Sequence, residues 1–325
     1  MNAVDATSIT QRFGKITAVD DVSFTVREGE LFGFIGPDGA GKTTLFRIAA
    51  TLIIPTGGRM NLFGLNVVSD FRELRNHIGY MPGRFSLYTD LTVEENLQFY
   101  ATIFGTTIHE NYYLIEPIYK QIEPFRKRLA GRLSGGMKQK LALSCALIHK
   151  PRILILDEPT TGVDAVSRTE FWEMLEGLKR EGITIIVSTP YMDEALRCDR
   201  IALMQQGKLM GIDTPAAIGS SYGKRIYAVS HRDRYRLLLA LRAMTEAVGP
   251  EPFGEAVHIT LREGASVEDV KKSLERAGLE NIKDAINYYL AAANQGFPLA
   301  QSNLAALYLR GEGLPQDDAK AVMNK

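Results

Sequence analysis

The sequence has few of the features that mark secreted, metal-clustering or membrane-spanning proteins. It has two cysteines in 325 residues, Cys145 and Cys198, which lie far apart and without a CxxC spacing. They predict neither a disulfide framework nor a metal cluster, which fits a reducing compartment. No run approaches the roughly 18 apolar residues of a membrane span. The N-terminus shows no signal-peptide pattern, so any membrane role would need a second chain to supply the span.

The chain also lacks an excess of charge of either sign. Lys and Arg together number 38, as do Asp and Glu, so the formal net charge is zero. This balance argues against a protein that coats nucleic acid and against a polybasic membrane anchor, and no nucleic-acid partner is expected. With 45% apolar and 23% charged residues the chain is globular. Its length predicts two or three domains.

Glycine is concentrated in one informative stretch, "LFGFIGPDGAGKTTLFR". A predicted strand, Leu31 to Ile35, leads into a glycine-rich loop and then a helix. Such a loop points backbone N–H groups at phosphate oxygens, and the helix adds the positive end of its dipole. Lys42 is expected to bridge the β- and γ-phosphates and the Thr43 hydroxyl to ligate Mg²⁺. The predicted nucleotide contacts are Gly36, Pro37, Asp38 (its carboxylate turned outward), Gly39, Ala40, Gly41, Lys42, Thr43 and Thr44.

A second stretch, "RILILDEPTTGVD", has an acidic pair at the end of a predicted buried strand, Ile153 to Leu156. Asp157 is placed to hold a Mg²⁺-bound water and Glu158 to polarise the attacking water as a general base. Taken alone, an acidic pair after an apolar strand is a common helix-cap arrangement. Beside the phosphate loop, the catalytic interpretation is favoured.

The stretch "RLSGGMKQKLALSCALIHKP" opens an amphipathic helix. Ser134 is a reasonable N-cap, and the two glycines after it, Gly135 and Gly136, allow close backbone approach. One interpretation is simply a capped helix. The other is an anion site at the helix start that completes the phosphate pocket of another subunit.

Together, Gly36–Thr44, Leu133–Gln139 and Asp157-Glu158 resemble, in order and spacing, the ATP-binding subunit of an ABC transporter. The compact predicted helical lobe and the "YMDEA" stretch look most like exporter-type subunits. The resemblance covers about residues 5–220. It implies an α/β fold, a P-loop ABC ATPase core with a helical lobe at about 84–130. It also implies Mg²⁺-dependent ATP hydrolysis, with Glu158 and Lys42 as catalytic residues and Thr43 and Asp157 as metal ligands.

The resemblance further implies a head-to-tail dimer, homo- or heteromeric, with two ATP molecules at its interface. Each ATP would lie between one subunit's phosphate loop and the other subunit's Ser134, Gly135 and Gly136. Asp164, in "TTGVD", matches the loop that touches the opposite subunit. Phe13 matches the aromatic residue that stacks on adenine, although a strand-edge core aromatic is the alternative.

The partners implied by the resemblance are separate multi-span membrane subunits, which would hold the ATPase peripherally at the cytoplasmic face of the membrane. The exported cargo is not defined by the sequence, and a drug- or lipid-like substrate is one expectation. The rival interpretations are a soluble ATP-switched clamp without a pore and a weakly hydrolysing, regulatory half of a hetero-dimeric transporter.

Two positions depart from the family pattern. Gly83 stands where a metal-linked glutamine is usual, and Pro190 where a histidine would contact the γ-phosphate. Proline offers neither a donor nor a titratable group. Either hydrolysis persists, because losing one positioning group often costs about 10²–10³ in rate, or the chain binds ATP and barely hydrolyses it. The sequence favours the first, since Lys42, Thr43, Asp157 and Glu158 are present; Arg84 and Tyr191 are candidate substitutes for the missing groups.

Beyond about residue 220 the pattern changes. Residues 221–281 predict a small α+β accessory domain of β-α-β-α order, with "RIYAV" and "AVHITL" as strands. Its first helix is expected to start at a Ser230 cap and run through Met244; its second would be capped by Ser266 and stop at Gly278. Residues 282–325 resemble a partial Sel-like helical repeat, related to tetratricopeptide helix pairs.

Overall fold

The computed structural model describes residues 1–221, 226–253 and 256–279. The chain divides into two units, Met1–Ile218 and a second that begins at Gly219. The helical repeat predicted for 282–325 lies outside the described residues. Within the described ranges, no helix is both long enough and apolar enough to cross a lipid bilayer.

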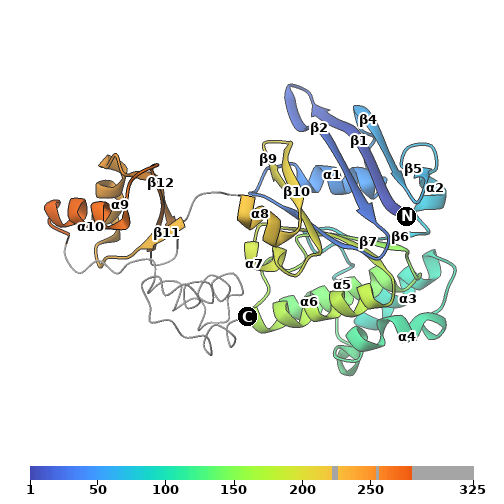
Figure 1. Ribbon diagram of the computed structural model, residues 1–325. Coiled ribbons are helices and arrows are strands. Elements are labelled where there is room, and N and C mark those ends of the chain that lie inside the picture. Colours follow the sequence, from blue (N-terminus) through green and yellow to red (C-terminus); the bar gives the residue numbers. More distant parts are fainter. Residues whose placement is uncertain (222–225, 254–255, 280–325) are drawn as a thin grey trace. The chain divides into compact units, whose positions relative to one another are not determined.

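The first unit is built on a six-stranded sheet (Figure 1). Its order is β10 (Lys208–Asp213), β9 (Arg200–Gln205), β3 (Leu31–Ile35), β8 (Thr184–Thr189), β7 (Ile153–Asp157) and β6 (Ile78–Met81). The pairs from β9 to β6 are parallel, and β10 is antiparallel to β9. Every residue of β3, β7 and β8 is buried, as expected for parallel strands covered on both faces.

The register of these strands brings distant sequence motifs to one edge of the sheet. Ile35 at the end of β3 pairs with Thr189 at the end of β8, and Asp157 of β7 pairs with Ser188. The phosphate loop, the acidic pair and the Pro190 turn all follow these carboxyl ends. Ligands of open parallel sheets bind at such an edge.

An antiparallel sheet packs beside the central one. Its order is β2 (Ile16–Arg27), β1 (Asn2–Phe13), β4 (Gly57–Leu62) and β5 (Leu65–Asn66). Aromatic rings join it to the central sheet and to α1 (Lys42–Ala49). The Phe34 ring of β3 meets Phe24 of β2 at 5.0 Å and Phe46 of α1 at 5.5 Å, both edge to face. These contacts fix α1, which begins in the phosphate loop, between the two sheets.

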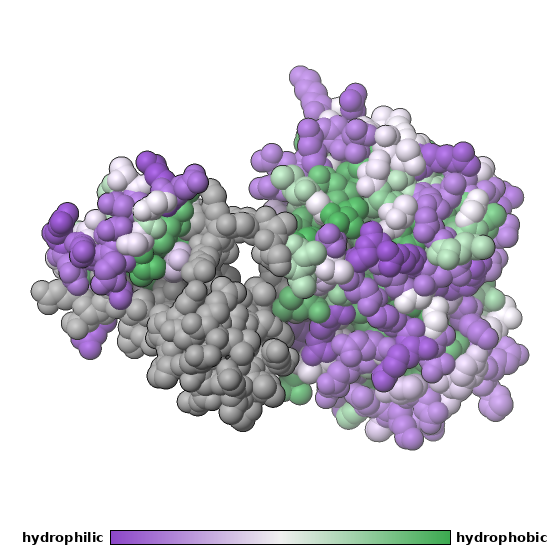
Figure 2. Space-filling model, viewed as in Figure 1, coloured by the Kyte–Doolittle hydropathy of each residue, from purple (hydrophilic) through white to green (hydrophobic). Residues whose placement is uncertain are grey.

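Most of the remaining helices lie on the opposite side of the central sheet (Figure 1). They are α3 (Val93–Ile103), α4 (Ile108–Tyr119), α5 (Gly135–Leu147) and α6 (Ala165–Arg180), with the shorter α2 (Phe71–Leu74), α7 (Met192–Ala195) and α8 (Pro215–Ser221) elsewhere. The sequence "TVEE" is typical of a capping box, and Thr92 and Glu95 form one at the start of α3. A second one, Thr107 with Glu110, starts α4 and was not anticipated from the sequence. Hydrophilic side chains cover most of the visible face of this unit (Figure 2).

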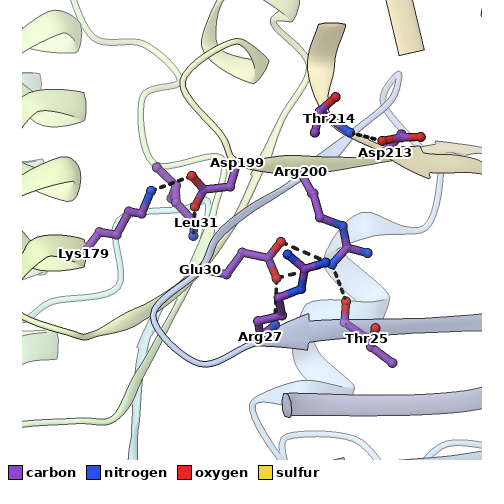
Figure 3. Close-up of polar contacts among 9 residues, drawn as sticks. All are labelled: Thr25, Arg27, Glu30, Leu31, Lys179, Asp199, Arg200, Asp213 and Thr214. Carbon is purple, nitrogen blue, oxygen red and sulfur yellow. Dashed lines mark hydrogen bonds and ion pairs between the residues drawn. The ribbon is translucent and has the colours of Figure 1, made fainter. Parts of the chain in front are cut away.

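The opposite, amino-terminal ends of β3 and β9 are held by two carboxylates (Figure 3). Asp199 accepts from the Leu31 backbone N–H at 2.9 Å and from Lys179 Nζ at 2.5 Å. Glu30, which is buried, lies 3.2 Å from the Arg200 guanidinium. These contacts fix the amino-terminal ends of the two strands, on the side of the sheet opposite the phosphate loop.

One histidine in the first unit is held neutral. His149 follows α5, and its ring stacks on Phe104 with centroids 3.8 Å apart. Its Nε2 lies 3.0 Å from the Ile78 carbonyl oxygen, so it is the donor there, and buried Nδ1 has no hydrogen-bond partner among the described residues. Burial lowers the pKa of His149 to about 4.

This histidine should make the protein acid-sensitive. The unfolded chain takes up a proton near pH 6.5 but the folded chain only near 4, so the stabilisation is complete above pH 6.5 and is lost as pH falls toward 4. The loss is about 3 kcal/mol. We expect urea unfolding of His149→Gln to show a shallower decline over this window than the native protein. Parallel declines in the two proteins would contradict this assignment.

The second unit is a three-stranded antiparallel sheet of order β11 (Ile226–Val229), β13 (Ala256–Leu261), β12 (Ala247–Phe253), packed against α9 (Arg234–Ala243) and α10 (Val267–Arg276). Leu237, Leu241 and Leu274 are fully buried in its core. The predicted Ser266 cap and the stop at Gly278 (φ 73°) agree with this structure.

Two details of the second unit differ from the sequence prediction. The order is β-α-β-β-α, because β12 was missed. Its prolines and the register shift between Val248 and Glu251 hide the alternation of a regular strand. Helix α9 starts later than predicted, since Asp233, not Ser230, accepts the N-terminal hydrogen bond from Arg236 N at 3.0 Å, and Met244 lies beyond its last turn.

Candidate nucleotide site

The phosphate loop requires glycine at particular points. Gly39 and Gly41 have φ of 78° and 102°, a region that side chains disfavour. A Cβ on Gly36 would meet the Met204 carbonyl oxygen at 2.1 Å, and one on Gly41 the Ala18 carbonyl oxygen at 2.4 Å. The loop therefore closes against β9 and β2 in a way that no larger residue permits.

Lys42 lies inside this loop with 3% of its surface exposed. Its Nζ donates to the carbonyl oxygens of Gly36 at 2.7 Å and Pro37 at 3.1 Å, and lies 3.5 Å from Glu158 Oε1. The two residues predicted to be catalytic are thus brought together. Asp38 is exposed, in agreement with its predicted outward direction.

Ser188 orients the acidic pair. Its hydroxyl donates to Asp157 Oδ1 at 2.6 Å and accepts from the Glu158 N–H at 2.9 Å. Glu158 itself has a φ of 48°, which is uncommon for a residue with a side chain and costs backbone energy. A strained conformation held by neighbouring hydrogen bonds is typical of functional residues.

The oxygen ligands at this site fit a magnesium ion that is also bound by a nucleotide. Thr43 and Asp157 offer oxygen ligands, which Mg²⁺ prefers. Within the described ranges, no group of three or more His, Cys, Asp or Glu side chains could hold a metal without other ligands. Phosphate oxygens or water would therefore have to complete the coordination.

The start of α5 is open to solvent at its first positions. Ser134 caps the helix by accepting from Met137 N at 3.3 Å, as predicted, and both it and Gly135 are exposed. Gly136 is buried, and a Cβ there would lie 2.7 Å from Ser167 Oγ. No hydrogen bond or ion pair among the described residues joins Ser134 to Lys42.

Two further predicted contacts are open to a partner. Phe13 is 51% exposed at the end of β1, so it is not the core aromatic of the alternative interpretation. Asp164 is the N-cap of α6, and its Oδ1 accepts from Ser167 N at 3.0 Å. That hydrogen bond lowers the pKa of Asp164 and keeps this exposed side chain charged.

The two positions that depart from the family pattern lie beside this edge. Gly83 follows β6, and a Cβ there would approach the Asp157 carbonyl oxygen to 3.1 Å, closer than an ordinary contact, so a side chain at this position would require the neighbouring backbone to shift slightly. Pro190 follows β8. The Tyr191 ring after it lies under the Arg168 guanidinium at 4.6 Å, so this side chain packs on α6.

The parallel sheet, the glycine loop at the start of α1 and the acidic pair define a P-loop nucleotide-binding protein. A family model described as "ABC transporter" matches residues 19–161. The probable multidrug ABC transporter ATP-binding protein YbhF of Escherichia coli is 42% identical over 217 residues, which is 65% of this chain and 37% of YbhF. The Nod factor export ATP-binding protein I of Burkholderia lata is 38% identical over 218 residues, 66% of this chain and 72% of that protein.

Solved structures agree. The chain resembles cbiO1 of Clostridium perfringens, part of the ABC transporter complex cbiONQ, with a TM-score of 0.61 and 25% identity over 68% of this chain and 92% of that one. It also resembles a dimeric, post-hydrolysis structure of the ATP-binding cassette MJ0796 bound to ADP and Pi. There the TM-score is 0.59 with 26% identity, over 65% of this chain and 98% of that one. The chain belongs to the ATP-binding subunits of ABC transporters, and it spans about a third of the length of YbhF.

Proposed function

We propose that this chain hydrolyses ATP to power export through separate membrane subunits. The observation that supports the proposal is the distance of 3.5 Å between Lys42 Nζ and Glu158 Oε1, next to Asp157 at the end of β7. A buried ammonium, a metal-binding carboxylate and a nearby base are the parts that phosphoryl transfer to water needs.

Each group has a role in that reaction. Lys42 would exchange its two loop carbonyls for phosphate oxygens and stabilise the charge that develops on them. Glu158 would accept a proton from the attacking water. Thr43 and Asp157 would hold Mg²⁺, which when bound neutralises phosphate charge. The remaining loop residues, from Gly36 to Thr44, would bind through backbone N–H groups, and Phe13 would stack on adenine.

The pocket is proposed to be completed by a second ATPase subunit. Ser134 and Gly135 are exposed at a helix start, where N–H groups favour an anion. Asp164 is close to this helix start, because Ser167 donates its N–H to Asp164 and its side chain packs on the buried Gly136. A head-to-tail dimer would place this surface over the other subunit's phosphate loop, and the similar cassette MJ0796 has been solved as a dimer.

Export and membrane association are inferred from relatives. YbhF is named for multidrug transport and protein I for Nod factor export, so we propose a drug- or lipid-like cargo, with the chain held peripherally at the cytoplasmic face by multi-span subunits. Residues 221–281 are proposed to regulate the ATPase or support its dimer, and 282–325 to form a helical repeat. The second candidate is a weakly hydrolysing half of a heterodimer, favoured by Gly83 and Pro190.

The test uses the purified full-length chain. We expect Mg²⁺-dependent phosphate release from ATP, loss of that release with EDTA, and ATP-dependent dimers when Glu158 is replaced by glutamine. Light scattering during size exclusion would detect those dimers. ATP binding without phosphate release would favour the regulatory-half candidate. A chain that neither binds ATP nor releases phosphate would contradict the proposal.

A further inference from the structure

A buried carboxylate beside the nucleotide edge has no part in the function described so far. Glu194 lies in α7, and only 2% of its side chain is exposed. Its Oε1 accepts from Thr160 Oγ1 at 2.6 Å, and its Oε2 accepts from the hydroxyl of Thr189. The Arg168 Nε is 3.6 Å from Oε1. One carboxylate thus joins the loop after β7, the end of β8 and the first turn of α6.

The arrangement is electrostatically demanding. A buried charge is strongly unfavourable unless it is paired and hydrogen-bonded. Here two hydroxyl donors and a guanidinium satisfy the carboxylate, and Thr160 and Thr189 are themselves buried at 1% and 0% exposure. Removing one donor would therefore disturb the geometry of the whole group.

The Thr160 hydroxyl lies two residues beyond Glu158, within a tight turn. The Thr161 N–H donates to the Glu158 carbonyl at 3.2 Å, and the Val163 N–H donates to the Thr160 carbonyl at 3.2 Å. The bond from Thr160 to Glu194 therefore fixes the turn that carries the proposed general base. It lies on the side of Glu158 that Ser188 does not hold.

The Thr189 hydroxyl ties down the turn at Pro190. It also accepts from the Tyr191 N–H at 3.0 Å, and the Tyr191 ring lies under Arg168. Because Pro190 has no N–H and no polar side chain, the residue itself cannot anchor this turn through a hydrogen-bond donor. Glu194 and its partners supply the anchorage from within the protein.

The same group reaches the surface proposed to bind the second ATP. Arg168 follows directly after Ser167, whose side chain packs on Gly136. A shift of Arg168 would move that contact as well. Glu194 thus connects the turn of one active site to the helix start that would serve the other.

We propose that Glu194 is a positioning residue, whose carboxylate holds the Glu158 turn through Thr160 and links it to the start of α5 through Arg168. The proposal rests on the proposed role of Glu158 in hydrolysis. It concerns the rate of the chemical step and not the affinity for ATP, because neither Glu194 nor Thr160 lies in the phosphate loop.

The experiment compares Thr160→Val, which has the same shape but no hydroxyl, with Thr160→Ser, which keeps the hydroxyl, in the full-length chain. We expect Thr160→Val to lower kcat about 10–100-fold with KM for ATP changed less than about twofold. Thr160→Ser should stay within about threefold of the native kcat. Glu194→Gln should lower kcat as much as Thr160→Val does. The control is Glu176→Gln, which removes a partly exposed ion pair with Arg197 and should leave kcat unchanged.

Three results would overturn the proposal: equal kcat for Thr160→Val and the native protein, an equal loss in Thr160→Ser, or a raised KM at unchanged kcat. If the native chain shows no turnover, the proposed function fails, but the positioning role still has its own readout. Amide exchange at Thr161 and Val163 in nucleotide-free protein should then be faster in Thr160→Val than in Thr160→Ser. Equal exchange rates would overturn it.

Discussion

Replacing Glu158 with glutamine is expected to lower ATP turnover by about two to four orders of magnitude. The amide has nearly the same shape, but it cannot accept the proton of the attacking water. Binding should persist or tighten, because the change removes a negative charge that lies 3.5 Å from the Lys42 ammonium, in the place where phosphate oxygens would approach. Steady-state phosphate release and equilibrium ATP binding, measured on the same preparation, check both halves of the expectation.

The matched control for that change is Glu176→Gln. Glu176 lies on α6 and pairs with Arg197 at 3.3 Å, with 47% of its side chain exposed. Its loss should leave turnover close to native, since an exposed pair of this kind contributes little. Turnover that survives in Glu158→Gln would remove this residue from the chemistry and leave Asp157 as the remaining acidic candidate.

Replacing Lys42 with methionine should lower turnover about 10²–10³-fold and also weaken ATP binding. Methionine fills much of the same space in the loop but offers no charge to the phosphates. Lys208→Met is the control, because that lysine is 65% exposed and pairs with Asp20 on the surface. Melting temperatures measured without nucleotide separate loop damage from lost phosphate contact. Native ATP affinity in Lys42→Met would contradict the role assigned to the ammonium.

Much of the site was predictable because its signals are local in sequence. The seventeen-residue stretch that begins at Leu31 contains the signals for a strand, a turn and a helix: the apolar run Leu31 to Ile35 and the glycines after it. Ser134 was predicted as a helix cap for the same reason, since the capped N–H belongs to Met137, three residues on. Short-range hydrogen bonds leave a pattern that a sequence displays directly.

The supporting residues were not predictable in this way. Ser188 reaches Asp157 across 31 positions of the chain, and Glu194 reaches Thr160 across 34. These pairs exist because β7 and β8 are parallel neighbours whose ends coincide, and sequence spacing does not encode that neighbourhood. A search for small hydroxyl residues at the ends of predicted buried strands would have pointed to Ser188. For Glu194 no such signal was present, because an acidic residue in a short polar stretch such as "YMDEA" is typical of an exposed helix.

The most direct test of the account is to mix two inactive variants, Lys42→Met and Ser134→Arg. If each ATP site combines the phosphate loop of one subunit with the α5 start of the other, a mixed dimer has one doubly damaged site and one intact site. Mixing equal amounts should then restore about a quarter of native turnover, because half of the dimers are mixed and each has one working site of two. A mixture as inactive as either variant alone would show that the sites are not shared between subunits, and would contradict the account.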